Sequence, residues 1–285
     1  SNLIKENCII NTLKLMELRG PDSSNSITKY HQSKKIALLH TRLNIIDLHS
    51  RSDQPFVDKN LTLIFNGEIY NYLEIKKNLE YKYNFKTESD TEVLLKAYQE
   101  YGEKCVDHFI GMWSFAIWDD KKKELFLSRD PFGEKPLYYF ISKKGFFFGS
   151  EIKYIKSLCK EDFSLNKDLI RQNLFLGYKS INKQNSTFYE KINILENSTN
   201  LKINFKLDKK LIKYWEPKCV VNKNMSKNES IEGARHHLVK SLKYRMRSDV
   251  PLAFCLSGGV DSGALVSIAK KKFKSKYFNI FYNRQ

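Results

Sequence analysis

The sequence predicts a chain of mixed α and β structure, in which a domain of antiparallel sheets and helices precedes the start of a parallel-sheet domain. Two observations support this fold class. Between about residues 36 and 150, short runs rich in β-branched and aromatic residues alternate with polar turns, as in antiparallel sheets. Near the end, an apolar run, a glycine-rich loop, a helical stretch and a second apolar run follow one another, in the order of a βαβ unit.

Composition places the chain among globular proteins. Its 285 residues are 41% hydrophobic and 13% aromatic, which is enough for a sizeable core. No apolar run approaches a membrane span and the polar opening lacks the plan of a signal peptide, so we expect a cytoplasmic protein with no membrane contact. The five cysteines are scattered without CxxC spacing, which favours neither a disulfide framework nor a metal site.

The net charge of +17 raises the question of nucleic-acid binding, because basic surfaces attract polyanions. Only nine of the 49 basic residues are arginine, and the lysines are spread along the chain without interleaved aromatics. We therefore predict a lysine-rich solvated surface and no nucleic-acid partner.

The first domain is expected over residues 1–210. Helices are predicted from apolar periodicity over residues 3–18, 70–80 and 89–101. The last of these opens with Ser89 and Glu92 at the spacing of a capping box. The predicted strands are KIALLHTRLNII, LTLIFNG, MWSFAIWD, ELFLSRD, LYYFIS and GFFFGSE, followed by two short ones in the Asn-rich and Lys-rich stretch after residue 185.

The second domain is expected over residues 211–285. Its elements are a helix over residues 229–247, a strand over 250–256, a helix over 263–273 and a strand over 277–282. One βαβ unit buries too little surface to be stable alone, so we expect the chain to stop inside this domain.

The loop CLSGGVDSG joins the strand and helix of that unit. A strand that feeds a Gly-Gly turn and a helix presents backbone N–H groups and the positive end of the helix dipole to an anion. Gly258 and Gly259 allow close approach of phosphate oxygens, Ser257 and Ser262 carry hydroxyls, and Asp261 suits Mg²⁺ or a helix cap. An ordinary capped helix after a buried strand explains the same residues.

SGGVDS resembles the signature of the ATP-pyrophosphatase superfamily, whose loop holds pyrophosphate while AMP is transferred to an acceptor. The resemblance implies ATP and Mg²⁺ as cofactors and cleavage at the α-phosphorus, which explains the lack of a Walker-type lysine. The implied ATP-binding residues are Leu256, Ser257, Gly258, Gly259, Val260, Asp261 and Ser262.

FNGEIYN taken alone indicates a β-hairpin, because Asn-Gly is the favoured two-residue turn. Read in order with RGPD, LLHTRLNIIDL, SDTEVLLKAY, GMWSFAIWD and RDPFGEKPLYY, it resembles the class II glutamine amidotransferase domain of the asparagine synthetase family, from about residue 10 onward. The resemblance implies an α+β N-terminal-nucleophile sandwich, arranged αββα, followed by the start of an α/β domain like those of the adenine nucleotide α-hydrolases.

The resemblance also implies a glutamine site. Arg42 would bind the substrate carboxylate, and Asn66 and Gly67 would form the oxyanion hole as the catalytic residues. Glu68 and Asp90 would hold the substrate ammonium. Taken singly, Arg42 is also explained as a surface cation and Asp90 as the first-turn acid of its helix.

The nucleophile of this family is a cysteine at the mature N-terminus, whose α-amino group serves as the base. The sequence begins with Ser1, Cys8 falls inside a predicted helix without a free amine, and Cys105 is interpreted as a packing residue. We therefore expect the sequence to lack the first strand and nucleophile of the family, or the protein to have lost glutaminase activity.

The implied function is glutamine-dependent asparagine synthesis by a ligase whose partners are glutamine, aspartate and ATP, with a homodimer as a candidate assembly. Glutamine is hydrolysed to ammonia, which displaces AMP from an aspartyl-adenylate. Related amidotransferases acting on sugar, peptide or β-lactam precursors remain an alternative. A glucosamine-phosphate type is disfavoured by SGGVDS, a PP-loop tRNA-modifying enzyme leaves the first 200 residues unexplained, and a non-catalytic basic module requires a truly absent nucleophile.

Overall fold

The computed structural model describes residues 4–177, 185–273 and 278–282. The chain forms two compact units. The first comprises Ser1–Leu43 and His49–Glu216, and the second comprises Asn44–Leu48 and Pro217–Gln285. The domain limits expected at residue 210 stay a prediction.

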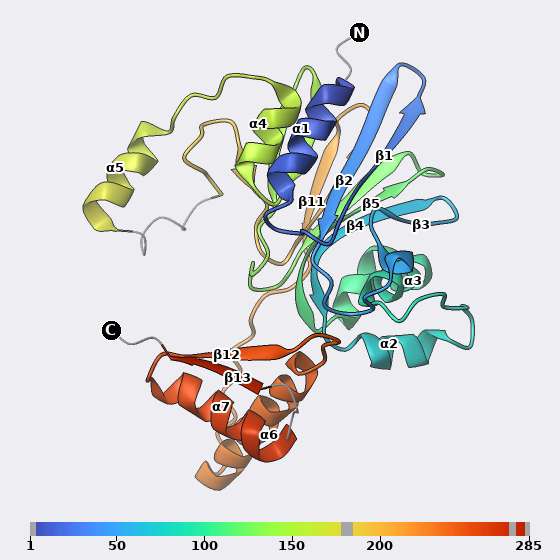
Figure 1. Cartoon of the computed structure of the whole chain (residues 1–285). Coiled ribbons are helices and arrows are strands. Elements are labelled where there is room, and N and C mark those ends of the chain that lie inside the picture. Colours follow the sequence, from blue (N-terminus) through green and yellow to red (C-terminus); the bar gives the residue numbers. More distant parts are fainter. Residues whose placement is uncertain (1–3, 178–184, 274–277, 283–285) are drawn as a thin grey trace. The chain divides into compact units, whose positions relative to one another are not determined.

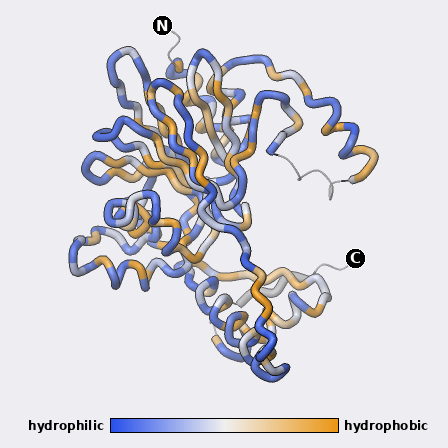
Figure 2. The backbone as a smooth tube through the Cα atoms, turned by 180° about the vertical axis from the view of Figure 1, so that it is seen from behind, coloured by the Kyte–Doolittle hydropathy of each residue, from blue (hydrophilic) through white to orange (hydrophobic). Residues whose placement is uncertain are grey.

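The first unit is built on a six-stranded antiparallel sheet with the order β11-β10-β6-β5-β4-β3. These strands are β3 Phe56–Asp58, β4 Leu61–Ile69, β5 Gly111–Asp119, β6 Glu124–Arg129, β10 Thr199–Asn204 and β11 Lys209–Lys213. β5 lies between β4 and β6, and seven of its nine residues are buried, because layers of the fold cover both faces of the sheet at this central strand. Hydrophobic stretches follow the strands of this unit, and the turns between them are hydrophilic (Figure 2).

Two smaller sheets form a second β layer. One pairs β1 Ser23–His31 with β2 Lys34–Arg42, and the other has the order β8-β7-β9, with β7 Tyr138–Ser142, β8 Gly145–Gly149 and β9 Asn193–Ile194. Their apolar residues pack with those of the large sheet in one buried core. This core includes Leu38, Ala116, Trp118, Leu127, Leu137, Tyr139 and Leu201.

Helices cover the outer face of each β layer (Figure 1). α1 Glu6–Met16 packs against α4 Ile152–Cys159, where the hydroxyl of Thr12 donates to that of Ser157 at 2.8 Å. On the other side, α2 Tyr72–Leu79 and α3 Asp90–Tyr101 pack together, and α3 contacts β4. The remaining helical elements are η1 Ser50–Ser52, η2 Gly102–His108 and α5 Lys167–Leu176. The four layers have the predicted order αββα.

The second unit contains α6 Lys227–Arg245, β12 Leu252–Leu256, α7 Val260–Phe273 and β13 Phe278–Tyr282. β12 and β13 pair in parallel, which confirms the βαβ unit; Tyr277, the first residue of the predicted strand, lies outside the described residues. The segment Asn44–Leu48 joins this unit through Asp47, whose backbone N–H donates to Asp249 Oδ2 at 2.7 Å. Among the described residues, no helix has the length and apolarity needed to cross a membrane.

Two expectations about the strands are wrong, and three strands are additional: β1, β3 and one of β9, β10 and β11. Asn66 and Gly67 form no turn, because β5 pairs with β4 continuously through both residues. The predicted strand that ran beyond Arg42 ends there, and its last residues belong to the second unit. The mostly polar sequence SSNSITKYH does not predict β1; it is a strand because all nine of its residues pair with β2.

The predicted capping box at α3 is also wrong. Ser89 is the N-cap, but its hydroxyl accepts from Thr91 N rather than from Glu92 N. The Glu92 carboxylate instead accepts from Lys86 N at 2.9 Å, from Thr87 N at 2.7 Å and from the Thr87 hydroxyl at 2.8 Å. The turn before the helix is buried at Thr87, so its N–H groups require a protein acceptor.

We expect Glu92→Ala to destabilise the first unit by about 2 to 6 kcal/mol, because it leaves two N–H groups without their acceptor, at about 1 to 3 kcal/mol each. Urea unfolding measures this change. Glu88→Ala is the control, since its side chain is 67% exposed and surface ion pairs contribute about 0 to 1 kcal/mol. Equal effects of the two substitutions would contradict the assignment.

Candidate active site

Three of the predicted site residues are consecutive on β4. Side chains alternate between the faces of a strand, so Asn66 and Glu68 share one face and Gly67 occupies the other. Asn66 lines a cavity between the two β layers. The polar residues of NGE are therefore held by a rigid sheet and not by a flexible turn.

The edge of β4 that faces away from β5 is open around Gly67. β3 pairs with β4 only from Leu61 to Leu63. Trp113, the partner of Gly67 on β5, directs its backbone groups to Asp130: its C=O accepts from Asp130 N at 2.9 Å and its N–H donates to Asp130 Oδ2 at 3.3 Å. Gly67 thus belongs to a non-hydrogen-bonded pair, and its own N–H and C=O face the open edge.

The next outward-facing N–H groups on either side of Gly67, those of Phe65 and Ile69, donate to side chains. Phe65 N donates to Gln54 Oε1 at 2.6 Å, and Ile69 N donates to Asp90 Oδ2 at 2.9 Å. Within the described residues, no side chain accepts from the N–H of Gly67. The edge therefore offers one backbone donor to a ligand, flanked by two that the protein already uses.

Gly67 is also required by packing. Its φ is +156°, and a Cβ at this position would lie 2.1 Å from the carbonyl oxygen of Met112 and 2.8 Å from Trp113 Cα. These neighbours belong to the backbone of β5, so they cannot move aside as a flexible side chain would. No other residue fits without separating β4 from β5.

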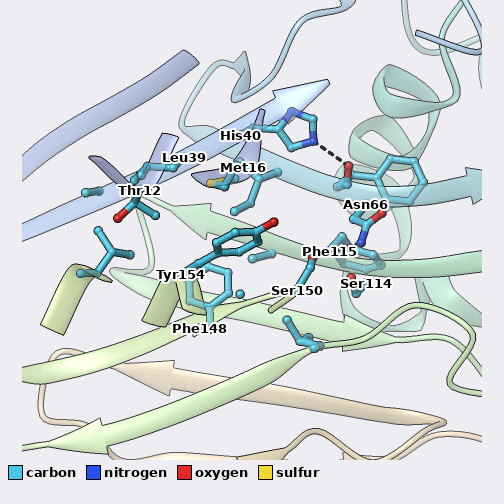
Figure 3. Close-up of a pocket in the computed structure, with 17 residues that line it drawn as sticks. Thr12, Met16, Leu39, His40, Asn66, Ser114, Phe115, Phe148, Ser150 and Tyr154 are labelled. Atoms are coloured by element: carbon cyan, nitrogen blue, oxygen red, sulfur yellow. Dashed lines mark hydrogen bonds between the residues drawn. The ribbon is translucent and has the colours of Figure 1, made fainter. Parts of the chain in front are cut away.

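The side-chain amide of Asn66 donates to the hydroxyl of Ser150 at 3.0 Å. Both residues line a cavity of about 100 Å³, together with Ser114, His40 and the ring of Tyr154 (Figure 3). Leu39, Phe115 and Phe148 supply apolar wall. An amide N–H in such surroundings is a stronger electrostatic donor than it would be in water.

His40 lies on β2 and bonds to β4 across this cavity (Figure 3). Its Nε2 is 3.0 Å from the carbonyl oxygen of Phe65, so Nε2 carries the proton and donates. Burial lowers the pKa of His40 to about 4, with the hydrogen bond to Phe65 opposing that shift and Arg42 adding to it. The ring is therefore neutral at pH 7.

Arg42 is not the surface cation of the simpler interpretation, because only 5% of it is exposed. Its guanidinium donates to the carbonyl of His49 at 3.1 Å and to Asp53 Oδ1 at 3.0 Å. The RGPD turn fixes the end of β2: a Cβ on Gly20 would lie 2.4 Å from the backbone of Thr41, and Asp22 N donates to the Arg42 carbonyl at 3.0 Å.

Glu68 and Asp90 are two interacting carboxyl groups whose pKa values are both raised. Asp90 opens α3 and is buried, and burial raises its pKa to about 6. Burial also raises the pKa of Glu68 to about 7, the negative charge of Asp90 adds to the shift, and Lys135 opposes it. A cation bound between these groups would lower both pKa values, because it favours their charged forms.

The ATP loop expected from the sequence lies in the second unit, between β12 and α7. Ser257 and Ser262 close it: their hydroxyl oxygens are 3.1 Å apart, and Ser257 N donates to Ser262 Oγ at 3.3 Å. Gly258 has φ +81°, which favours glycine, whereas a Cβ added at Gly259 would have no neighbour closer than 3.6 Å. Val260 is 88% exposed, and Asp261 lies in the first turn of α7.

The structure brings the five predicted glutamine-site residues together in the first unit, with electrostatic coupling from Arg42 to Asp90 and from Asp90 to Glu68. Their roles stay predictions. Gln54, His40 and Ser150 contact this site from separate segments and were not predicted from the sequence. Only the position of His40 within LLHTR gave a signal. Cys8 is buried in α1 and Cys105 is fully buried, so neither resembles a reactive thiol.

We expect Asp90→Asn to lower the pKa of Glu68 from about 7 toward its ordinary value, because the neighbouring charge is removed while burial remains. The asparagine oxygen can still accept from Ile69 N. A carbon-13 NMR titration of the Glu68 carboxyl measures the change, with Glu88 as an exposed internal reference. An unchanged Glu68 midpoint would show that the two carboxylates are not coupled.

Comparison with known sequences agrees with this geometry. The glutamine amidotransferase domain family matches residues 2–215, and the asparagine synthase family matches residues 233–284. The chain is 37% identical, over 90% of its length, to a putative glutamine-hydrolysing asparagine synthetase of Methanocaldococcus jannaschii, and 36% identical, over 94%, to one of Bacillus subtilis. It covers 53% and 37% of these two relatives, so it spans about half of their length or less.

Solved structures share the fold at low sequence identity. The glutamine phosphoribosylpyrophosphate amidotransferase of B. subtilis aligns over 99% of this chain and 64% of its own, with a TM-score of 0.53 and 18% identity. A second structure, described as the allosteric regulatory enzyme of purine biosynthesis, aligns over 97% of the chain with a TM-score of 0.52 and 17% identity. The predicted amidotransferase sandwich is confirmed, and the chain belongs to the glutamine amidotransferase domain family.

Proposed function

We propose that this chain is the glutaminase domain and the first part of the synthetase domain of a glutamine-hydrolysing asparagine synthetase. The observation that carries the proposal is the backbone N–H of Gly67, which faces an open strand edge beside the Asn66 amide and next to two acidic side chains. Glutamine needs such donors for an oxyanion and such acidic groups for its ammonium, and it also needs a cation for its carboxylate.

Each part of glutamine has a matching group in this arrangement. Gly67 N and the Asn66 amide would stabilise the oxyanion that forms when the side-chain amide is attacked. Glu68 and Asp90 would take the ammonium, and their raised pKa values would fall as it binds. Arg42 would bind the carboxylate through guanidinium N–H groups, with Asp53 holding the guanidinium in place.

The attacking cysteine would stand on chain that precedes α1. This chain would lie as a strand between β2 and β8, each of which has one partner strand among the described residues. Two cavities, of about 100 and about 460 Å³, follow one another between these strands and share Ala37 and Phe148 in their walls.

The direction of this added strand follows from its ends. Ile4 lies at the far end of the larger cavity, and Asn66 lines the smaller one. A segment that precedes Ile4 would therefore begin near Asn66 and lead toward Ile4. It would run antiparallel to both β2 and β8. Its first residue would stand next to the proposed oxyanion hole, where the nucleophile is needed.

The second unit would bind ATP with Mg²⁺ and activate the side-chain carboxylate of aspartate as an acyl-adenylate. Gly258, Gly259 and the serine hydroxyls would hold the leaving pyrophosphate, and Asp261 would help to place Mg²⁺. Ammonia from the first unit would displace AMP. We place this reaction in the cytoplasm, and propose a homodimer as the assembly.

A different acceptor carboxylate is the second candidate. The chain is also 29% identical, over 92% of its length, to a protein of Gibberella zeae named amidase chry2. This differently named relative is the observation that favours an amidotransferase acting on a carboxylate other than that of aspartate.

In the full-length protein, Asn66→Ala should lower kcat for glutamine hydrolysis by roughly a hundredfold or more, equivalent to about 2.7 to 4 kcal/mol for one oxyanion donor. Arg42→Ala should mainly raise KM for glutamine. Ammonia release with glutamine measures both, and synthesis from free ammonia is the control that should survive. Loss of ammonia-dependent synthesis to the same extent would contradict the division of labour between the units.

The full-length protein should convert ATP to AMP and pyrophosphate when aspartate and ammonia are supplied. Asp261→Asn should abolish synthesis while glutamine hydrolysis continues. Gly259→Val should do the same, because a side chain there would block the close approach of phosphate oxygens; within the described residues a Cβ at this position meets no neighbour closer than 3.6 Å. Chromatography of the nucleotides decides: ADP as the main product rejects the ATP-pyrophosphatase chemistry, and AMP without asparagine rejects aspartate as the acceptor.

A further inference from the structure

Both backbone polar groups of Phe65 are bound by side chains instead of by a neighbouring strand. Its N–H donates to Gln54 Oε1 at 2.6 Å, and its C=O accepts from His40 Nε2 at 3.0 Å. Gln54 precedes β3 and His40 lies on β2, so the two side chains come from separate segments. Together they supply the hydrogen bonds that a continued β3 would have supplied.

Gln54 also reaches the helix that carries Asp90. Its Nε2 donates to the hydroxyl of Thr91 at 3.3 Å, and both residues are buried, with 5% and 3% of their surface exposed. Asp90, the neighbour of Thr91, accepts from Ile69 N. The strand edge and the start of α3 are thus tied together on both sides of Gly67, at Phe65 and at Ile69.

This arrangement fixes the direction in which Gly67 N points. β5 holds β4 from one side only, and on the other side β3 pairs with β4 no further than Leu63. A hydrogen bond on each side of Gly67 leaves its peptide little freedom, so its N–H is presented to a ligand without reorganisation. Preorganised donors of this kind are those that stabilise a transition state well.

We propose that Gln54 and His40 are positioning residues for glutamine hydrolysis, which hold the open edge of β4 so that Gly67 N–H meets the developing oxyanion. This inference rests on the proposed glutaminase function. Neither residue needs to touch the substrate. Their loss should weaken transition-state binding more than substrate binding, and so lower kcat with little change in KM.

The test uses the full-length protein with Gln54→Leu, which keeps the approximate volume and removes both hydrogen bonds. We expect kcat for glutamine hydrolysis to fall roughly tenfold or more, with KM changed by less than about threefold. Gln54→Glu keeps an acceptor for Phe65 N and should recover most of the lost kcat. Gln99→Leu is the matched control: this half-buried amide donates to Asp58, away from Gly67, and its loss should leave kcat within about twofold.

A second readout separates positioning from general stability. The γ-aldehyde analogue of glutamine forms a tetrahedral adduct with a thiol and places an oxyanion at Gly67. Its affinity should fall with kcat in Gln54→Leu, whereas the affinity of the product glutamate should stay nearly constant. Equal loss of the two affinities would show a merely structural role and overturn the inference.

His40→Leu provides an independent variant in case Gln54→Leu does not fold. It should give the same pattern, because it removes the bond to the Phe65 carbonyl. A folded variant of either kind with unchanged kcat would overturn the positioning role. Failure of the unaltered protein to release ammonia from glutamine would instead reject the proposed function itself, so the two failures are distinguishable.

Discussion

β4 extends beyond the end of its neighbour β3, and the candidate site lies along the part of β4 that β3 does not pair with. β4 has nine residues, of which β3 pairs with three. The N–H groups beyond that point must find other acceptors, because an unsatisfied buried donor costs about 1 to 3 kcal/mol. Gln54 and Asp90 provide them at Phe65 and Ile69, which brings a loop and the start of α3 to the strand. Gly67, between them, keeps its N–H for a ligand.

The same arrangement explains the electrostatics of the site. The buried Asp90 carboxylate accepts a hydrogen bond from Ile69 N, and its negative charge helps to raise the pKa of Glu68. Both pKa values are raised above their unfolded values, so the folded state holds more protons between the ordinary range and about pH 7, and the stability of the first unit falls as pH rises through that window. A bound ammonium group would offset this loss, because it favours the charged carboxylates. The two acidic side chains are therefore suited to a cationic ligand.

Glycine has two different uses in the two units. At Gly67 the neighbouring backbone of β5 forbids a side chain, so the residue is needed by the fold whether or not a ligand binds. Within the described residues, a Cβ added at Gly259 would have no neighbour closer than 3.6 Å. The absence of a side chain there agrees with a loop that approaches phosphate oxygens.

The sequence by itself determined the helices α1, α2, α3, α6 and α7, the βαβ unit and the ordered motifs that mark the glutamine site, because periodicity and motif order are written along the chain. The helices α4 and α5 were not predicted. The tertiary structure alone decided how local preferences were resolved. Asn66 and Gly67 lie within a strand because β5 pairs with it continuously. The Glu92 carboxylate accepts from Thr87 N in the buried turn instead of completing a capping box with Ser89. Gln54 and His40 were missed for the same reason: which N–H groups face an open sheet edge depends on strand register and on where the neighbouring strand ends, and neither is readable from local sequence.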